Sequence, residues 1–116
     1  MTADGMDLYY LAEGDQVRIV LRGELHSDTV GQLEQTAASA LSGPGVARLE
    51  LDMRLVTYAE SSALRCLLGI RRDAQRAGVE LVLVRPMMDW VMRIFDVSGL
   101  SDYFAFTPDP GALPTS

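Results

Sequence analysis

Two adjacent hydroxyl side chains, Ser61 and Ser62, stand where the longest predicted helix begins, directly after Glu60. Serine oxygens at such a position accept hydrogen bonds from the unpaired amide hydrogens of the first helical turn. The same helix end also favours a bound anion, because the backbone dipoles leave a partial positive charge there. The pair therefore has two interpretations, plain capping of the helix or a place for a negatively charged group.

The other residues that could do chemistry are isolated in the sequence. Cys66 is the only cysteine and His26 the only histidine, and they are far apart along the chain. No nucleophile has a visible base, and no cysteine cluster, P-loop or G-x-G-x-x-G fingerprint is present. We therefore expect no enzyme, no metal and no cofactor. His26 is either a solvated loop residue or a group that senses a nearby phosphate, and Cys66 is an inert, largely buried thiol.

The length and the net charge of the chain limit the number of domains and the kinds of partner that it can bind. A chain of 116 residues fits one domain. The net charge is −6, so the molecule as a whole repels phosphate backbones and we expect no nucleic-acid partner. No apolar run approaches the roughly 20 residues of a spanning helix, and the first residues do not read as a signal peptide. These features predict a cytoplasmic protein with no membrane insertion.

The hydrophobic pattern predicts an α/β chain in which an initial hairpin is followed by alternating helices and strands. Gly23 is expected to end the second strand, and Ser27 or Asp28 to cap the first helix. The predicted strands cover residues 7–12, 16–22, 47–53, 79–84 and 103–106, and the predicted helices cover 30–41, 61–77 and 87–97.

This order of elements favours a mixed sheet of four to five strands, with an N-terminal hairpin, parallel crossovers and helices mainly on one face. The domain is expected over residues 6–107, with flexible tails at 1–5 and 108–116. In the last helix, Val91, Ile94 and Phe95 already form a core-facing stripe. Met88, Trp90 and Met92 therefore predict an exposed apolar patch for dimerisation or partner binding, unless Trp90 folds back onto the body.

Three segments resemble one known family when they are taken in order. The run LDMRLVTYAESSAL at residues 51–64 resembles the strand–loop–helix signature of STAS domains, which usually reads L-D-L-S-G-V-x-[FY]-[LM]-D-S-S-G-L. The run MRIFDVSGL at 92–100 is similar to the family's third helix and its S-G-L ending, and Gly23-Glu24-Leu25 is similar to the G-E-L-D turn. The resemblance implies a STAS fold.

The resemblance also implies a function. In anti-sigma factor antagonists, the second serine of D-S-S-G is phosphorylated by a kinase that is also the anti-sigma factor, and phosphorylation switches the antagonist off. By position, Ser62 would be the phosphate acceptor. The residues around the phosphorylation site and the partner contact would be Glu60, Ser61, Ala63, His26 and Asp28.

Several of these positions depart from the family pattern. Glu60 replaces aspartate, Ala63 replaces glycine, and His26 replaces the aspartate of G-E-L-D. These changes favour an alternative function more than they favour the switch. The alternative is a non-phosphorylated STAS scaffold or adaptor, within a stress-signalling complex or beside a membrane transporter. In both cases the chain acts by binding protein.

Overall fold

The computed structural model describes residues 5–107. The predicted flexible tails lie outside these residues except for Gly5, whose carbonyl accepts a hydrogen bond from the Glu24 amide. Within the described part, the elements in chain order are β1 (Met6–Glu13), β2 (Gln16–Leu25), α1 (Val30–Leu41), β3 (Arg48–Ala59), α2 (Ser61–Ala77), β4 (Glu80–Val84), α3 (Asp89–Ser98), a 3₁₀ turn (Ser101–Tyr103) and β5 (Ala105–Phe106).

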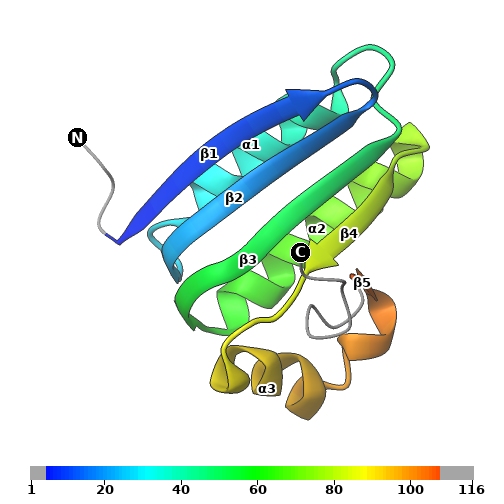
Figure 1. Cartoon of the computed structure of the whole chain (residues 1–116). Coiled ribbons are helices and arrows are strands. Elements are labelled where there is room, and N and C mark those ends of the chain that lie inside the picture. Colours follow the sequence, from blue (N-terminus) through cyan, green and yellow to red (C-terminus); the bar gives the residue numbers. More distant parts are fainter. Residues whose placement is uncertain (1–4, 108–116) are drawn as a thin grey trace, which may run out of the picture.

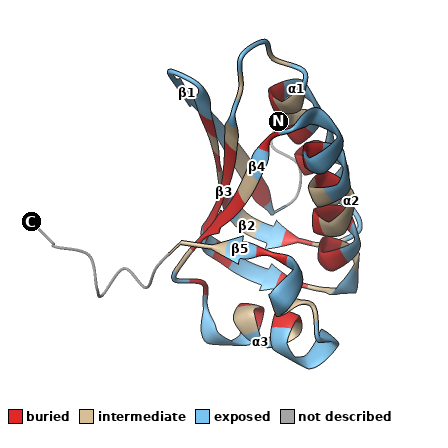
Figure 2. Cartoon of the chain, turned by 90° about the vertical axis from the view of Figure 1, so that its right-hand side faces the viewer, coloured by how far each residue is buried: buried red, intermediate tan, exposed pale blue. Residues whose placement is uncertain are grey.

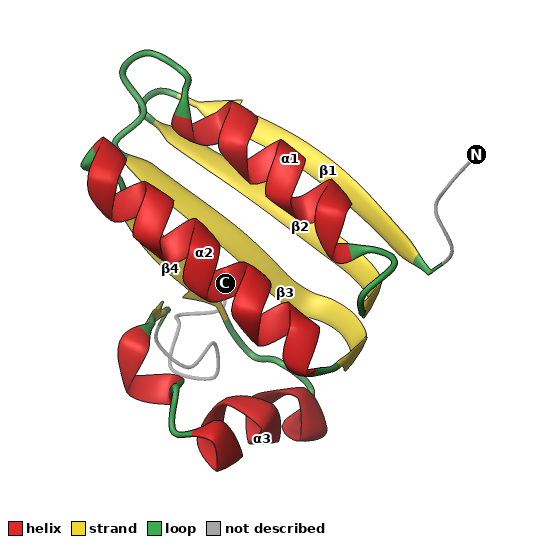
Figure 3. Ribbon diagram, turned by 180° about the vertical axis from the view of Figure 1, so that it is seen from behind, coloured by secondary structure: helices red, strands yellow, loops and turns green. Residues whose placement is uncertain are grey.

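The strands form one five-stranded sheet in the order β1-β2-β3-β4-β5. β1 and β2 are antiparallel, and the other neighbouring pairs are parallel. Helices α1 and α2 lie side by side on one face of the sheet, and α3 lies near the end where β3 finishes and α2 begins (Figures 1 and 3). The predicted mixed sheet, with its hairpin, its parallel crossovers and its helices mainly on one face, is confirmed.

Period-two alternation places the core between the sheet and these two helices. The inward side chains of β2 and β3, such as Ile19, Leu21 and Leu51, are fully buried there, as are Leu33 of α1 and Leu67 of α2. Figure 2 shows that the buried positions of both helices face the sheet while their outer positions are exposed. Apolar burial of this kind is the main favourable contribution to folding.

The opposite face of the sheet carries no α1 or α2, yet two acidic side chains of β3 are buried there. Asp52 is 2% exposed and Glu50 is 9% exposed. Arg18 of β2 pairs with both carboxylates, at 2.7 Å from Glu50 and 3.4 Å from Asp52. Arg54 pairs with Asp52 at 2.7 Å, and Arg48 with Glu50 at 2.9 Å. The polar alternate positions of β3 therefore hold an ion-pair network.

Gly23 does not end β2, so that part of the prediction is wrong. The strand continues to Leu25 with register shifts against β3, and Gly23 adopts φ +113°. A Cβ at this position would collide with the carbonyl oxygen of Gly5. Glycine is thus the residue that lets the start of β1 pair closely with β2.

The predicted cap of α1 is also wrong. Thr29 occupies the N-cap position instead of Ser27 or Asp28, and its side chain makes no capping bond. The Thr29 hydroxyl is fully buried and turned back to the carbonyl of Glu24, at 2.8 Å. It stabilises the tight loop between β2 and α1.

Candidate functional site

The start of α2 follows β3 after a single residue, Glu60. This residue is the N-cap, in an extended conformation, and its carbonyl accepts the Ala63 amide hydrogen at 2.8 Å. Ser61 and Ser62 are therefore the first two residues of the helix, and no side chain makes a capping hydrogen bond. Plain capping by these serines is wrong. Ser61 is exposed, Ser62 is half-buried and Ala63 is buried.

The Glu60 carboxylate joins three segments of the chain. Its Oε1 accepts a hydrogen bond from the Tyr58 hydroxyl at 3.2 Å. Its Oε2 accepts from the Ser62 hydroxyl at 3.4 Å and from the Ser27 amide at 3.3 Å. The hydrogen bond to Glu60 raises the pKa of Tyr58, because the ionised phenol would lose it. The candidate serine thus lies against a carboxylate that also holds the loop between β2 and α1.

His26 and Asp28 lie in that loop. The Nδ1 atom of His26 accepts a hydrogen bond from the Asp28 amide at 3.2 Å, and its Nε2 atom is 3.5 Å from Glu24 Oε1. The His26 side chain is half-buried and is held by the protein, so the simply solvated interpretation is wrong. Asp28 is exposed. Since Glu60 contacts Ser27, the structure brings this loop and the serines together.

An exposed apolar surface lies beside these residues. Trp90 is 43% exposed, and its ring centroid is 5.5 Å from that of Tyr58, which is 39% exposed. Met88 is 41% exposed. Met92, in contrast, is half-buried against the core, so its place in the predicted patch is wrong. We call Tyr58, Met88 and Trp90 the exposed cluster.

Tyr58 was not among the residues singled out from the sequence. The signal that could have found it is the aromatic position of the family signature, which Tyr58 occupies two residues before Glu60. At that place the strand ends on the same side of the molecule as α3, so the tyrosine meets both the carboxylate and the tryptophan.

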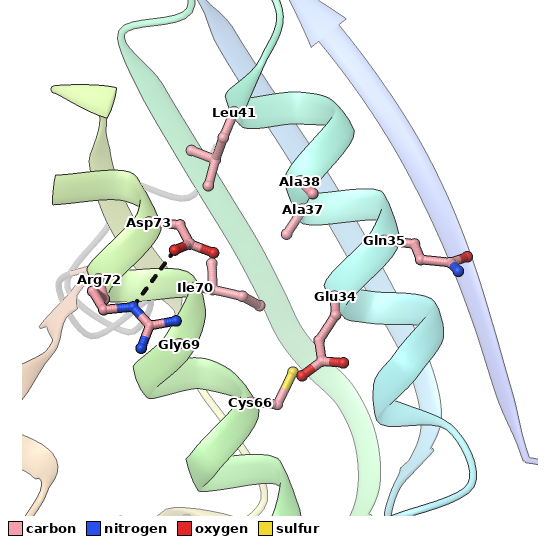
Figure 4. A pocket seen from close by; sticks show the side chains of 10 residues that line it. All are labelled: Glu34, Gln35, Ala37, Ala38, Leu41, Cys66, Gly69, Ile70, Arg72 and Asp73. Atoms are coloured by element: carbon pink, nitrogen blue, oxygen red, sulfur yellow. Dashed lines mark ion pairs between the residues drawn. The ribbon is translucent and has the colours of Figure 1, made fainter. Parts of the chain in front are cut away.

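Cys66 lies in a different place, a groove between α1 and α2 with a volume of about 330 Å³. Figure 4 shows the thiol near Glu34, with small residues such as Ala37 and Gly69 lining the groove and a surface pair, Arg72 and Asp73, at its rim. Burial, together with the Glu34 carboxylate, raises the pKa of the thiol to about 12. Cys66 therefore stays protonated near neutral pH and is a poor nucleophile.

Within residues 5–107, no group of three or more histidine, cysteine or acidic residues is arranged to hold a metal ion. None of the helices in the same part is long and apolar enough to cross a membrane.

The chain is similar to known proteins in sequence and in fold. The family model described as "Mlab, STAS domain" matches residues 10–108. An anti-sigma-B factor antagonist of Listeria monocytogenes is 27% identical over 88 residues, which cover 76% of this chain and 75% of that protein.

Solved structures show the same fold. The anti-sigma factor antagonist SpoIIAA in its unphosphorylated form is 22% identical, with a TM-score of 0.71 over 92% of this chain and 91% of that one. SpoIIAA of Bacillus in its phosphorylated form is 21% identical, with a TM-score of 0.65 over 92% and 95%. Because the family model spans most of the described sheet and helices, the chain belongs to the STAS domain family.

Proposed function

We propose that this chain is an anti-sigma factor antagonist, which binds an anti-sigma factor that is also a serine kinase and is switched off by phosphorylation of Ser62. The single observation that carries the proposal is the position of Ser62 beside the Glu60 carboxylate, next to the exposed cluster. The likeness to antagonists from Listeria and to both forms of SpoIIAA supports it.

Electrostatics gives this position the properties of a switch. A phosphate adds about −1.5 to −2 charges near neutral pH. The free amide hydrogens at the start of α2 stabilise such a group locally. However, the Glu60 carboxylate is only 3.4 Å from the Ser62 hydroxyl, so a phosphate there is repelled by it.

The repulsion has consequences for the neighbouring contacts. If Glu60 turns away, the hydrogen bonds from Tyr58 and from the Ser27 amide are lost together. A partner that covers the exposed cluster would then face both a rearranged loop and a dianion that it must desolvate, which is costly. Phosphorylation therefore weakens binding, while the fold of the antagonist is retained.

The direct test is binding of the anti-sigma factor to Ser62→Asp and Ser62→Ala variants, measured by calorimetry. We expect Ser62→Ala to bind as the wild type does and Ser62→Asp to bind at least about tenfold more weakly, a difference of about 1.4 kcal/mol. Ser39→Asp is the matched control, because it places the same charge at an exposed serine near the end of α1 that is farther in sequence from the loop contacted by Glu60. Incubation with the kinase and ATP, followed by mass mapping, must place the phosphate on Ser62.

A specific observation favours a second candidate function, the non-phosphorylated scaffold or adaptor. The Ser62 hydroxyl is half-buried and already donates to Glu60, so a kinase must break this contact to reach it. Under this alternative, the same surface binds a partner constitutively. Equal affinities of the Ser62→Asp and Ser62→Ala variants, with no phosphate after kinase treatment, would support the adaptor and exclude the switch.

A further inference from the structure

β1 is an edge strand with an unusual surface. Only β2 pairs with it, and among residues 5–107 no strand lies along its outer side. The Glu24 amide donates to the Gly5 carbonyl, which identifies Gly5 and Glu24 as a hydrogen-bonded pair of the ladder. Bonded pairs alternate in an antiparallel ladder, so Leu8, Tyr10 and Ala12 direct their amide and carbonyl groups outward.

This edge carries two charges, Asp7 and Glu13 near its ends, and otherwise lacks the features that normally protect edges. It contains no lysine and no proline, and its pairing with β2 is unbroken by any bulge. Exposed apolar residues lie on both of its faces. Tyr9 and Leu11, on the uncovered face, are 46% and 56% exposed, and Tyr10, on the helix side, is 48% exposed. An exposed, flat and apolar edge strand is a ready template for pairing with another chain.

We propose that β1 pairs with β1 of a second copy of this chain, so that two five-stranded sheets join into one continuous sheet. A two-fold axis perpendicular to the sheet makes the two strands antiparallel. Residues paired directly across two strands lie on the same face, and side chains alternate between faces along each strand. The axis must therefore pass between one residue and the same residue of the second copy. Four registers keep at least five residues of each β1 in the shared ladder, and they are centred on Leu8, Tyr9, Tyr10 or Leu11.

Charge selects among these registers. A centre at Tyr10 places Asp7 opposite the second copy's Glu13, and like charges directly opposite are destabilising. Centres at Leu8 and at Leu11 both shorten the shared ladder, because the first leaves residues 11–13 and the second leaves residues 6–8 without a partner in the other strand. A centre at Tyr9 places each tyrosine against its copy, sets Asp7 against the apolar Leu11, and bonds Leu8 to Tyr10. The uncharged middle of the strand is thus self-complementary in this register.

The joined sheet leaves the candidate site open. β2 separates β1 from β3, and α3, which carries Trp90, lies away from β1 (Figure 1). The dimer surface is therefore different from the patch at Met88 and Trp90, and its test does not depend on phosphorylation or on the anti-sigma factor. Each dimer presents two copies of the site.

Cysteine cross-linking tests the register. In the register centred on Tyr9, the two copies of a Tyr9→Cys variant have Cα atoms about 4.5 Å apart, within the range of a disulfide. The two copies of a Leu11→Cys variant are then about 14 Å apart. We expect mild oxidation to give a covalent dimer for Tyr9→Cys and none for Leu11→Cys. The wild type is the background control, since its Cys66 is only 4% exposed.

Sedimentation of the uncross-linked chain tests the association itself. We expect a concentration-dependent dimer for the wild type and a dissociation constant at least about tenfold higher for Tyr9→Lys, because two ammonium groups would meet at the axis. Val97→Lys, on an 80% exposed position of α3, is the matched control and should dimerise as the wild type does. A wild type that stays monomeric, or a cross-link at residue 11 in place of residue 9, would overturn the proposal.

Discussion

On the helix side of β3, Leu49, Leu51 and Met53 are completely covered by apolar neighbours. On the other side of the same strand, Glu50 and Asp52 are covered by the side chains of arginines. Both sides exclude water from β3. The helix side does so by apolar packing, in which neighbouring side chains must match in volume and shape. The opposite side does so by ion pairing, in which each carboxylate must meet its hydrogen-bond donors.

The difference concerns what happens when one group is removed. A lost methyl group on the packed side leaves a cavity that rigid neighbours cannot fill. A lost carboxylate on the paired side leaves arginines without that partner. The side chains of Arg18 and Arg54 are 36% and 46% exposed, so they can turn toward water. We therefore expect the packed side to be the more sensitive of the two.

The largest effect is expected for Leu51→Ala. This side chain is fully buried, so its truncation should lower the free energy of unfolding by about 3 kcal/mol, within the range of roughly 2–5 kcal/mol for such changes. Chemical denaturation measures it, with the exposed Val97→Ala as the control. A loss below about 1 kcal/mol would mean that the helix layer repacks freely over β3.

A smaller effect is expected for Asp52→Ala on the paired side. We expect the free energy of unfolding to fall by roughly 1–3 kcal/mol, because Arg54 and Arg18 lose a buried partner but keep access to water. Asp52→Asn, which keeps a hydrogen-bond acceptor and loses the charge, should lie between the wild type and Asp52→Ala. Unchanged or increased stability of Asp52→Ala would show that the ion pairs do not stabilise the fold.

Of the two sides of β3, only the paired side carries carboxylates that acid can protonate, so only this side should lose stability at low pH. Burial by itself raises the pKa values of Glu50 and Asp52, but hydrogen bonds from Arg18, Arg48 and Arg54 outweigh it, and both pKa values are lowered. A lowered pKa contributes stability that is complete above the unfolded pKa, about 4, and is lost as the pH falls through the folded value. Denaturation midpoints between neutral pH and pH about 3 should decline less steeply for a Glu50→Gln, Asp52→Asn double variant. Equal slopes would contradict this assignment.

The smallest effect is expected for an ion pair outside β3. Arg72 and Asp73 are 3.6 Å apart on α2, and both side chains are more than half exposed. Asp73→Ala should change the free energy of unfolding by no more than about 0.5 kcal/mol, since solvent and salt screen such pairs. A larger loss would mean that the exposure of Arg18 and Arg54 does not explain the lower sensitivity expected on the paired side of β3.

The fold was predictable where local pattern decides it. The bounds of α2 are those expected from its amphipathic period and from the glycine that follows it. The length of β3 was not predictable, because its second half continues only by pairing with β2 across register shifts, and the exposed Leu55 interrupts its alternation. The burial of Glu50 and Asp52 was hidden for a similar reason, since their arginine partners come in part from another strand.

The candidate site was predictable in part. Family resemblance pointed to Ser62, Glu60 and His26, and the structure brings these segments together. The contact of Tyr58 with Trp90 joins a strand end to a helix more than thirty residues later, and no local period reveals such a contact. Met92 was misassigned although helical spacing places it on the covered side of α3, beside the buried Val91 and three residues before the buried Phe95.

Trp90 is the only tryptophan in the chain. Its indole lies against the Tyr58 ring, and the Tyr58 hydroxyl lies on the carboxylate beside Ser62. Indole emission shifts in wavelength when the polarity around the ring changes, so an intrinsic fluorescence titration would follow events at this surface without a label. The fluorescence of Trp90 can therefore be used to follow the binding of a partner to this surface in real time.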